Sequence, residues 1–173
     1  MQLSTSITNK IKGCIYGQAI GDALGLGCEF MSQEEVRKYY PNTLTRYDQI
    51  IRDRQWSMWK EGEWTDDTDM MICIARTRLN NHFNVEKTAE NFKEWFNHSP
   101  RGIGRHTYNI LAIGDYLKAL FKVSELFWNL SRQKNAANGA LMRTSVLATS
   151  PYVDEEEITD ICRLTHYDPR CVG

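Results

Sequence analysis

The spacing of apolar residues along the chain predicts helices almost throughout. Apolar side chains recur every three or four positions between residues 5 and 25, which is typical of a helix with one buried face. A shorter helix is expected in "SQEEVRKYYP", because Ser32 and Glu35 are spaced as a capping box and Pro41 ends the segment. The same period predicts further helices over these ranges: about 66–79, 84–97, 104–121, 123–132, 139–149 and 154–166.

No segment shows the strict alternation of a strand, so the pattern predicts an all-α protein, a multi-helix bundle. Residues 41–64 have no sustained period and form a long connection, and loops of this length are often functional. The predicted helix at 154–166 begins with Asp154 and Glu157 in capping-box positions. With no linker or repeat along the chain, we expect a single domain spanning residues 1–173.

Composition fits one soluble globular domain and excludes several function classes. Of the 173 residues 42% are hydrophobic and 25% charged, and the net charge of -1 comes from intermingled acidic and basic residues. We therefore expect no nucleic acid and no membrane as partner, since both call for a basic surface. The 5 cysteines are scattered, which argues against a disulfide framework and against a zinc site and favours a reducing, cytoplasmic setting. No signal sequence or apolar run of about 18 residues is evident.

The segment "WTDDTDM" at 64–70 places three carboxylates directly before an apolar run. One interpretation is that Thr65 caps a helix and the acids complement its positive amino end. The other follows from burial. The next residues are apolar on nearly every side, so the first turn lies at an inner wall, where carboxylates need a partner.

A divalent cation would be such a partner. Adjacent helical positions lie about 100° apart, so Asp66 and Asp67 can face different cations, and Thr65 adds a hydroxyl and a carbonyl between them. Hard oxygen ligands of this kind suit Mg²⁺ or Mn²⁺ and do not suit zinc. Asp69 could be a ligand, an acid that orients one, or a solvated charge, and we favour the orienting role.

Four stretches carry a resemblance to a known family: "GQAIGDALGLGCEF" at 17–30, "WTDDTDM" at 64–70, "NGALMR" at 138–143 and "THYDP" at 165–169. "RGIG" at 101–104 is a weaker fifth match. Together these stretches resemble the ADP-ribosylglycohydrolase family, which includes dinitrogenase-reductase-activating glycohydrolases, ADP-ribosylarginine hydrolases and the J1 crystallins. The resemblance implies an all-α orthogonal bundle with two Mg²⁺ or Mn²⁺ ions in a central cleft. It also implies hydrolysis of the glycosidic bond between ADP-ribose and a protein side chain or small conjugate.

The resemblance assigns roles by position. Thr65, Asp66 and Asp67 match the first metal-binding motif, and Glu29 matches a glutamate at the mouth of the metal site, so the expected catalytic residues are Glu29, Asp66 and Asp67. From the residues alone, an exposed loop acid is the favoured interpretation of Glu29, and only the resemblance assigns it to the site.

The resemblance also predicts a substrate site, with a turn beside the ribose, a loop around the diphosphate and a histidine on the nucleotide side. These residues are, in that order, Gly102 and Gly104; Asn135, Ala136, Ala137, Asn138 and Gly139; and His166. Backbone N–H groups at the start of the 139–149 helix would add donors for the diphosphate. By itself, His166 could simply face the last carbonyls of a helix.

The chain departs from the family pattern in one respect. The second half of the metal site, an Asp-x-Asp-Thr run, has no counterpart, so the C-terminal helices of the bundle are expected to be lacking. The alternative function is therefore a non-catalytic ADP-ribose-binding or crystallin-like structural homologue. Expected partners are an ADP-ribosylated protein or ADP-ribose conjugate and a completing chain or a second copy. The leaving group and the choice between Mg²⁺ and Mn²⁺ stay open.

Overall fold

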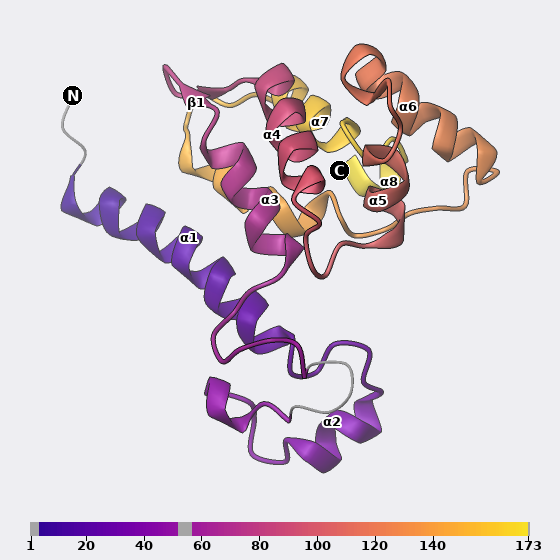
Figure 1. Cartoon of the computed structure of the whole chain (residues 1–173). Coiled ribbons are helices and arrows are strands. Elements are labelled where there is room, and N and C mark those ends of the chain that lie inside the picture. The colour runs from indigo at the N-terminus through magenta and orange to yellow at the C-terminus, as the bar shows by residue number, and fades with distance from the viewer. Residues whose placement is uncertain (1–3, 52–56, 173) are drawn as a thin grey trace. The chain divides into compact units, whose positions relative to one another are not determined.

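The computed structural model describes residues 4–51 and 57–172 and divides the chain into two compact units. The first unit is Met1–Thr65 and the second is Asp66–Gly173. Figure 1 shows the elements of both units along the chain. The expectation of a single domain over residues 1–173 stays a prediction.

The prediction of an all-α protein is confirmed, since nearly all regular elements of the described chain are helices. The first unit holds α1 (Thr5–Gly25), α2 (Gln33–Tyr39) and the short 3₁₀ helix η1 (Tyr47–Gln49). The predicted capping box of α2 is present: Ser32 Oγ accepts from the N–H of Glu35 (3.2 Å), and Glu35 Oε2 accepts from the N–H of Ser32 (2.7 Å). Within α1 only Ala23 is buried.

A small apolar cluster and one tyrosine organise the end of the first unit. Leu26 and Trp59 are buried together, with Met31 packed against them. The hydroxyl of Tyr40 donates to the carbonyl of Gly27 (2.8 Å) and accepts from the N–H of Ile51 (3.2 Å). The described part of 41–64 contains no α-helix, as expected for a connection.

The second unit is a set of helices packed around α3 and α4. Its elements are α3 (Asp66–Ala75), β1 (Arg78–Leu79), β2 (His82–Phe83), α4 (Val85–Asn97), α5 (Arg105–Leu111), α6 (Tyr116–Leu130), η2 (Leu141–Arg143), η3 (Ser145–Thr149), α7 (Glu155–Arg163) and α8 (Pro169–Val172). One side of α3 packs against α4 and another against η2 and η3, while α4 also contacts α5, α6 and α7 (Figure 1). No helix among the described residues is long and apolar enough to cross a membrane.

The helix predicted at 66–79 ends earlier, at Ala75, and is followed by a hairpin that the pattern did not predict. Strands β1 and β2 pair antiparallel, and the two residues between them, Asn80 and Asn81, have φ of 50° and 69°. Two consecutive residues with positive φ form the tight turn that matches strand twist, and asparagine tolerates this conformation.

The helices predicted at 104–121 and 123–132 are divided differently. The first stops at Leu111, and α6 then runs from Tyr116 through the predicted gap to Leu130. Leu120 interrupts it with φ 22° and ψ -105°.

The prediction of an α-helix at 139–149 is wrong, because this stretch forms two short 3₁₀ helices, η2 and η3. Hydroxyls turn back onto their own backbone here: Thr144 Oγ1 donates to the carbonyl of Leu141 (3.0 Å) and Thr149 Oγ1 to that of Val146 (2.6 Å). Such bonds compete with the α-helical ladder. The expected N–H donors of an α-helix start are therefore not present at residue 139.

Candidate functional site

The carboxylate of Asp66 contacts the glycine turn that was assigned to the ribose. Asp66 is the first residue of α3 and is only 6% exposed. Its Oδ2 accepts from the N–H of Gly104 (3.3 Å), which is the N-cap of α5. Gly102, two residues earlier, has φ 82°, which favours glycine. The structure thus brings together a predicted metal ligand and the predicted ribose turn.

Thr65 is held by a carboxylate that the sequence interpretation left out of the site. The N–H of Thr65 donates to Asp22 Oδ2 (3.0 Å), and its hydroxyl donates to Asp22 Oδ1 (2.7 Å). Asp22 lies on α1, within the "GQAIGDALGLGCEF" stretch. Because both oxygens of Asp22 receive a donor from Thr65, the orientation of the Thr65 hydroxyl is set by Asp22.

The other acids of the turn differ in their contacts. Asp67 is half-buried in the first turn of α3. Asp69 Oδ2 accepts from the indole N–H of Trp95 on α4 (2.9 Å), so this carboxylate contributes to the packing of α3 on α4. Glu29 lies in the turn after α1 and is exposed.

The oxygen ligands at the start of α3 are of the type that a divalent ion prefers. They are too few to complete the coordination shell of the ion. Thr65, Asp66 and Asp67 offer hydroxyl, carbonyl and carboxylate oxygens, which are the ligands of Mg²⁺ and Mn²⁺. Among the residues that the structure describes, no group of three or more His, Cys, Asp or Glu side chains is placed to hold a metal. Mg²⁺ commonly uses one or two carboxylates and keeps several waters. These residues therefore fit one face of a metal shell.

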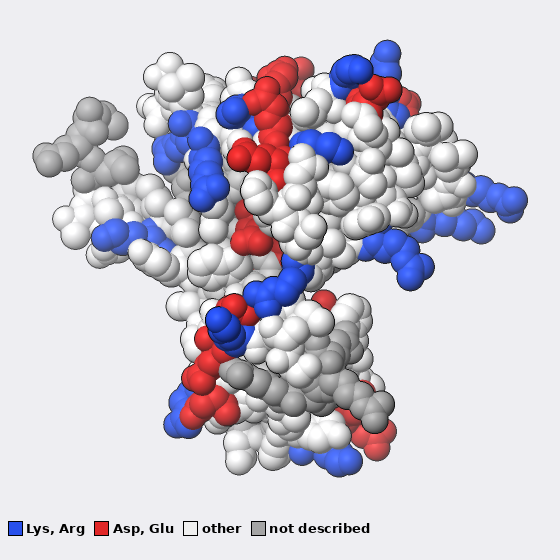
Figure 2. Space-filling model, viewed as in Figure 1, with Lys and Arg blue, Asp and Glu red and all other residues white. Residues whose placement is uncertain are grey.

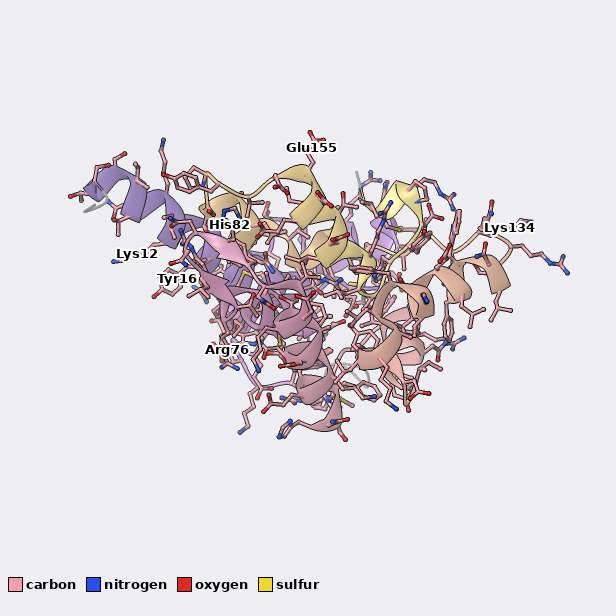
Figure 3. All side chains as sticks on the ribbon, turned by 90° about the horizontal axis from the view of Figure 1, so that it is seen from above. Lys12, Tyr16, Arg76, His82, Lys134 and Glu155 are labelled. Atoms are coloured by element: carbon pink, nitrogen blue, oxygen red, sulfur yellow. The ribbon has the colours of Figure 1, made fainter. Side chains whose placement is uncertain are left out.

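The predicted diphosphate loop, residues 135–139, follows α6. A backbone carbonyl and the side chain of Asn135 hold it against neighbouring segments. The labelled Lys134 in Figure 3 marks its start, just past the end of α6. Cys171 Sγ donates to the carbonyl of Ala137 (3.2 Å), and Asn135 Nδ2 contacts His106 Nδ1 (2.6 Å). Over residues 135–139 no backbone N–H donates to another atom of the described chain. The loop thus presents free donors, as an anion site requires.

His166 lies under this loop. It is 1% exposed, its Nδ1 is paired with Thr165 Oγ1 (2.8 Å), and its Nε2 has no partner within the described structure. A Cβ at Gly139 would come 2.7 Å from His166 Cε1 and 2.9 Å from Nε2, so glycine allows the loop to approach the ring. Burial, with the nearby charge of Arg143, lowers the pKa of His166 to about 2. The imidazole is therefore neutral.

Arg143, from the matched stretch "NGALMR", is fully buried and supports the second unit from inside. Its guanidinium donates to the carbonyls of Ile161 (3.1 Å) and Cys162 (3.4 Å) and lies 4.6 Å from the ring centroid of Phe92. Burial lowers its pKa to about 10, which leaves it charged at neutral pH. The partners of this buried charge are thus backbone carbonyls.

Figure 2 shows how charge is distributed on one face of the molecule. Lys and Arg side chains are scattered there among acidic ones and do not gather into one basic patch. Along α4, Glu86, Glu90 and Glu94 recur every four residues and are exposed. Repetition at this spacing places them on one side of the helix.

Comparison with known proteins identifies the family of this chain. A family model for ADP-ribosylglycohydrolases matches residues 3–173. A putative ADP-ribosyl glycohydrolase of Acanthamoeba polyphaga mimivirus is 30% identical over 82% of this chain and 41% of its own length. The ADP-ribosylarginine hydrolase Tri1 of Serratia proteamaculans is 27% identical over 78% of this chain and 35% of its own.

A third relative covers nearly the whole chain. The ADP-ribosyl-dinitrogen reductase glycohydrolase of Rhodospirillum rubrum is 27% identical over 95% of this chain and 53% of its own length. The chain belongs to the ADP-ribosylglycohydrolase family. The matched part of the chain covers between 27% and 53% of the length of four relatives, namely the three described above and an uncharacterised protein of Archaeoglobus fulgidus.

Proposed function

We propose that this chain provides the ADP-ribose site and the first set of metal ligands of a metal-dependent ADP-ribosylglycohydrolase. The reaction would cleave the glycosidic bond between ADP-ribose and a protein side chain or small conjugate. The observation that carries the proposal is the bond from the N–H of Gly104 to Asp66 Oδ2, because it joins the acidic turn to the glycine turn. The free N–H groups of the 135–139 loop support it further.

The chemistry is a hydrolysis at the anomeric carbon of the ribose. A water oxygen bonds to that carbon, the bond to the leaving nitrogen or oxygen breaks, and the leaving group keeps the electron pair and takes a proton. Thr65, Asp66 and Asp67 would hold one or both of the family's Mg²⁺ or Mn²⁺ ions, and a bound ion would orient the ribose hydroxyls and a water. Glu29 would accept the proton of that water or tune the site.

Recognition of ADP-ribose would come from the second unit. The diphosphate would accept from the backbone N–H groups of the 135–139 loop, namely those of Asn135, Ala136, Ala137, Asn138 and Gly139. Several such donors can bind its oxygens where one cationic side chain could not reach them all. Neutral His166 would lie beneath the nucleotide side without adding charge. Gly102 and Gly104 would face the ribose, where a side chain would hinder approach of the sugar.

The names of two relatives point to the kind of conjugate. One is an ADP-ribosylarginine hydrolase and another acts on ADP-ribosyl-dinitrogen reductase. We propose an ADP-ribosylated protein as substrate. We also propose a cytoplasmic location, which the odd number and wide spacing of the 5 cysteines support. A completing chain or a second copy would supply the remaining metal ligands.

Isothermal titration with Mn²⁺ and ADP-ribose tests the proposal directly. Asp66→Asn should weaken Mn²⁺ binding by at least about tenfold, because it removes a charged ligand. The matched control is Asp115→Asn, an exposed acid of the same unit that pairs with Lys118 (2.9 Å). It should leave Mn²⁺ affinity unchanged.

Release of ADP-ribose from an ADP-ribosylated arginine peptide, assayed with and without Mn²⁺, separates the two functions. Metal-dependent release supports the hydrolase. ADP-ribose binding without release, with any natural partner chain present, would instead identify a non-catalytic ADP-ribose-binding homologue. Absence of both Mn²⁺ and ADP-ribose binding would reject the proposal.

A further inference from the structure

We propose that His106 is a positioning residue that fixes the diphosphate loop by a hydrogen bond to Asn135. One tautomer of the neutral His106 ring makes this bond. This inference rests on the function proposed above and concerns a residue to which neither the motifs nor the comparisons assign a role. His106 lies in the first turn of α5, one residue after Arg105 and two after Gly104. Its ring is half-buried between the loop and the segment that follows α7.

Both ring nitrogens of His106 are engaged, each with a different segment. Nε2 lies 2.8 Å from the carbonyl oxygen of Thr165, and Nδ1 lies 2.6 Å from Nδ2 of Asn135. The ring also packs on His166, with centroids 4.5 Å apart and planes inclined by 53°. His106 therefore bridges the start of the loop to the residue that pairs with His166.

The partners decide which nitrogen carries the proton. A carbonyl oxygen can only accept, so Nε2 must carry the hydrogen and donate to Thr165. In the neutral imidazole Nδ1 is then an acceptor, and it receives the amide hydrogen of Asn135. A protonated ring would turn Nδ1 into a second donor facing the donor of Asn135, so this bond would be lost unless the Asn135 amide turned its oxygen toward the ring.

Other hydrogen bonds of the described structure also fasten the loop, and none of them holds Asn135. The N–H of Met142 donates to the carbonyl of Asn138 (3.2 Å). Arg170 Nη2 donates to the carbonyl of Gln133 (3.0 Å), and Cys171 Sγ donates to that of Ala137 (3.2 Å). Both fix carbonyls from the side of α8. Asn135 lies between Gln133 and Ala137 in the sequence, so His106 is the described contact that sets the position of the start of the loop, where the N–H groups without a described acceptor begin.

The charged and titratable groups around His106 favour its neutral form. Arg143 of η2 exerts a like-charge repulsion, and His166 is a neutral neighbour. Burial is the larger effect, and together with Arg143 it lowers the pKa of His106 below its usual range, against an opposing effect of the Thr165 carbonyl. ADP-ribose affinity should accordingly be constant above about pH 6.5 and fall as the pH is lowered and His106 takes up a proton.

A double-mutant cycle on ADP-ribose binding by this chain tests the inference. His106→Gln keeps a donor at the position of Nε2 and removes the acceptor at Nδ1, so it should weaken ADP-ribose about fivefold, which is the net value of one hydrogen bond. In an Asn135→Ala background the same change should have no further effect. His98→Gln, an exposed histidine of the same unit, is the control and should bind as the unchanged protein does.

Two further readouts separate positioning from general support of the fold. The ¹⁵N spectrum of the His106 ring should show the neutral form protonated at Nε2, and the loss of affinity at low pH should disappear in His106→Gln. Additive effects of His106→Gln and Asn135→Ala, or a ring protonated at Nδ1, would overturn the inference while the proposed function stands. If the unchanged protein binds no ADP-ribose, the proposed function fails, and the inference fails with it.

Discussion

At the scale of single residues, close approach and burial determine what the predicted site can be. Gly139 and His166 were assigned separately by resemblance, and the structure places them in contact. His106 and Asp22 were not assigned, because a histidine after a glycine turn and an acid in a small-residue helix have no signal of their own in the sequence. Each acquires its partner, Asn135 or Thr65, only by folding.

Gly139→Ala is expected to destabilise the loop over His166. Its Cβ would approach the His166 ring to 2.7 Å and Thr107 Oγ1 to 3.2 Å, so the backbone must shift. Overpacking of this kind costs about 2 kcal/mol in the free energy of unfolding, and ADP-ribose affinity should fall as well. Urea denaturation and calorimetry measure both, with Gly114→Ala as the control, since a Cβ there meets nothing within 4 Å. Equal effects of the two variants would contradict the close contact.

The free energy of unfolding should decrease as the pH is lowered, because His166 is buried as a neutral ring. Its folded pKa of about 2 lies below the usual 6.5, so the unfolded state binds the extra proton. The contribution is full above pH 6.5 and is lost progressively as the pH falls toward about 2. His166→Asn keeps a group that can pair with Thr165 and removes the titration. Its unfolding free energy should depend less on pH between 7 and 5 than that of His98→Gln. An unchanged slope would show that His166 is not buried neutral.

At the scale of elements, the N-terminal caps of helices were predicted better than the residues at which helices end or are interrupted. Ser32 and Asp154 cap α2 and α7 as expected, because a cap depends on residues only three positions apart. The second half of the expected capping box on α7 is missing, since the carboxylate of Glu157 accepts instead from the N–H of Phe83 and contacts His82 Nδ1 (2.9 Å). A helix start thus supports a hairpin more than 70 residues away in the sequence.

Glu157→Ala should therefore cost more than an ordinary surface change on α7. It leaves the N–H of Phe83 without its acceptor, at a cost of about 2 kcal/mol in unfolding free energy. Asp154→Ala, which removes only the cap, should cost about 1 kcal/mol. The matched control is Glu155→Ala, an exposed acid of the same turn that projects from α7 in Figure 3. Thermal unfolding ranks the three variants by their loss of unfolding free energy. A loss in Glu157→Ala no larger than that in Glu155→Ala would show that the contact of Glu157 with the hairpin does not stabilise the protein.

At the scale of the whole molecule, the described core lies mostly in the second unit. Buried apolar side chains of the first unit are Ala23, Leu26 and Trp59. Those of the second unit come from α3 to α7 and from the turns between them. One of them, Phe92, packs against the buried guanidinium of Arg143. Stability from apolar burial is therefore concentrated in Asp66–Gly173.

A fragment of residues 66–173 is expected to fold cooperatively, whereas residues 1–65 alone are not. The fragment keeps the packing of α3 on α4, η2 and η3, and short chains with few buried apolar residues seldom reach a positive free energy of unfolding. Urea unfolding followed by tryptophan fluorescence compares each piece with the whole chain. Cooperative unfolding of 1–65, or none in 66–173, would contradict this distribution of stability.

The sequence by itself determined the all-α class, most helix positions and the family, because these depend on local spacing and on short motifs. It did not determine the 3₁₀ form of 141–149, where Arg143 is drawn to carbonyls of α7, or the hairpin at 78–83. It also could not pair Asp66 with Gly104, or Asn135 with His106. Those contacts join residues distant in the chain, and only tertiary packing decides which donor meets which acceptor.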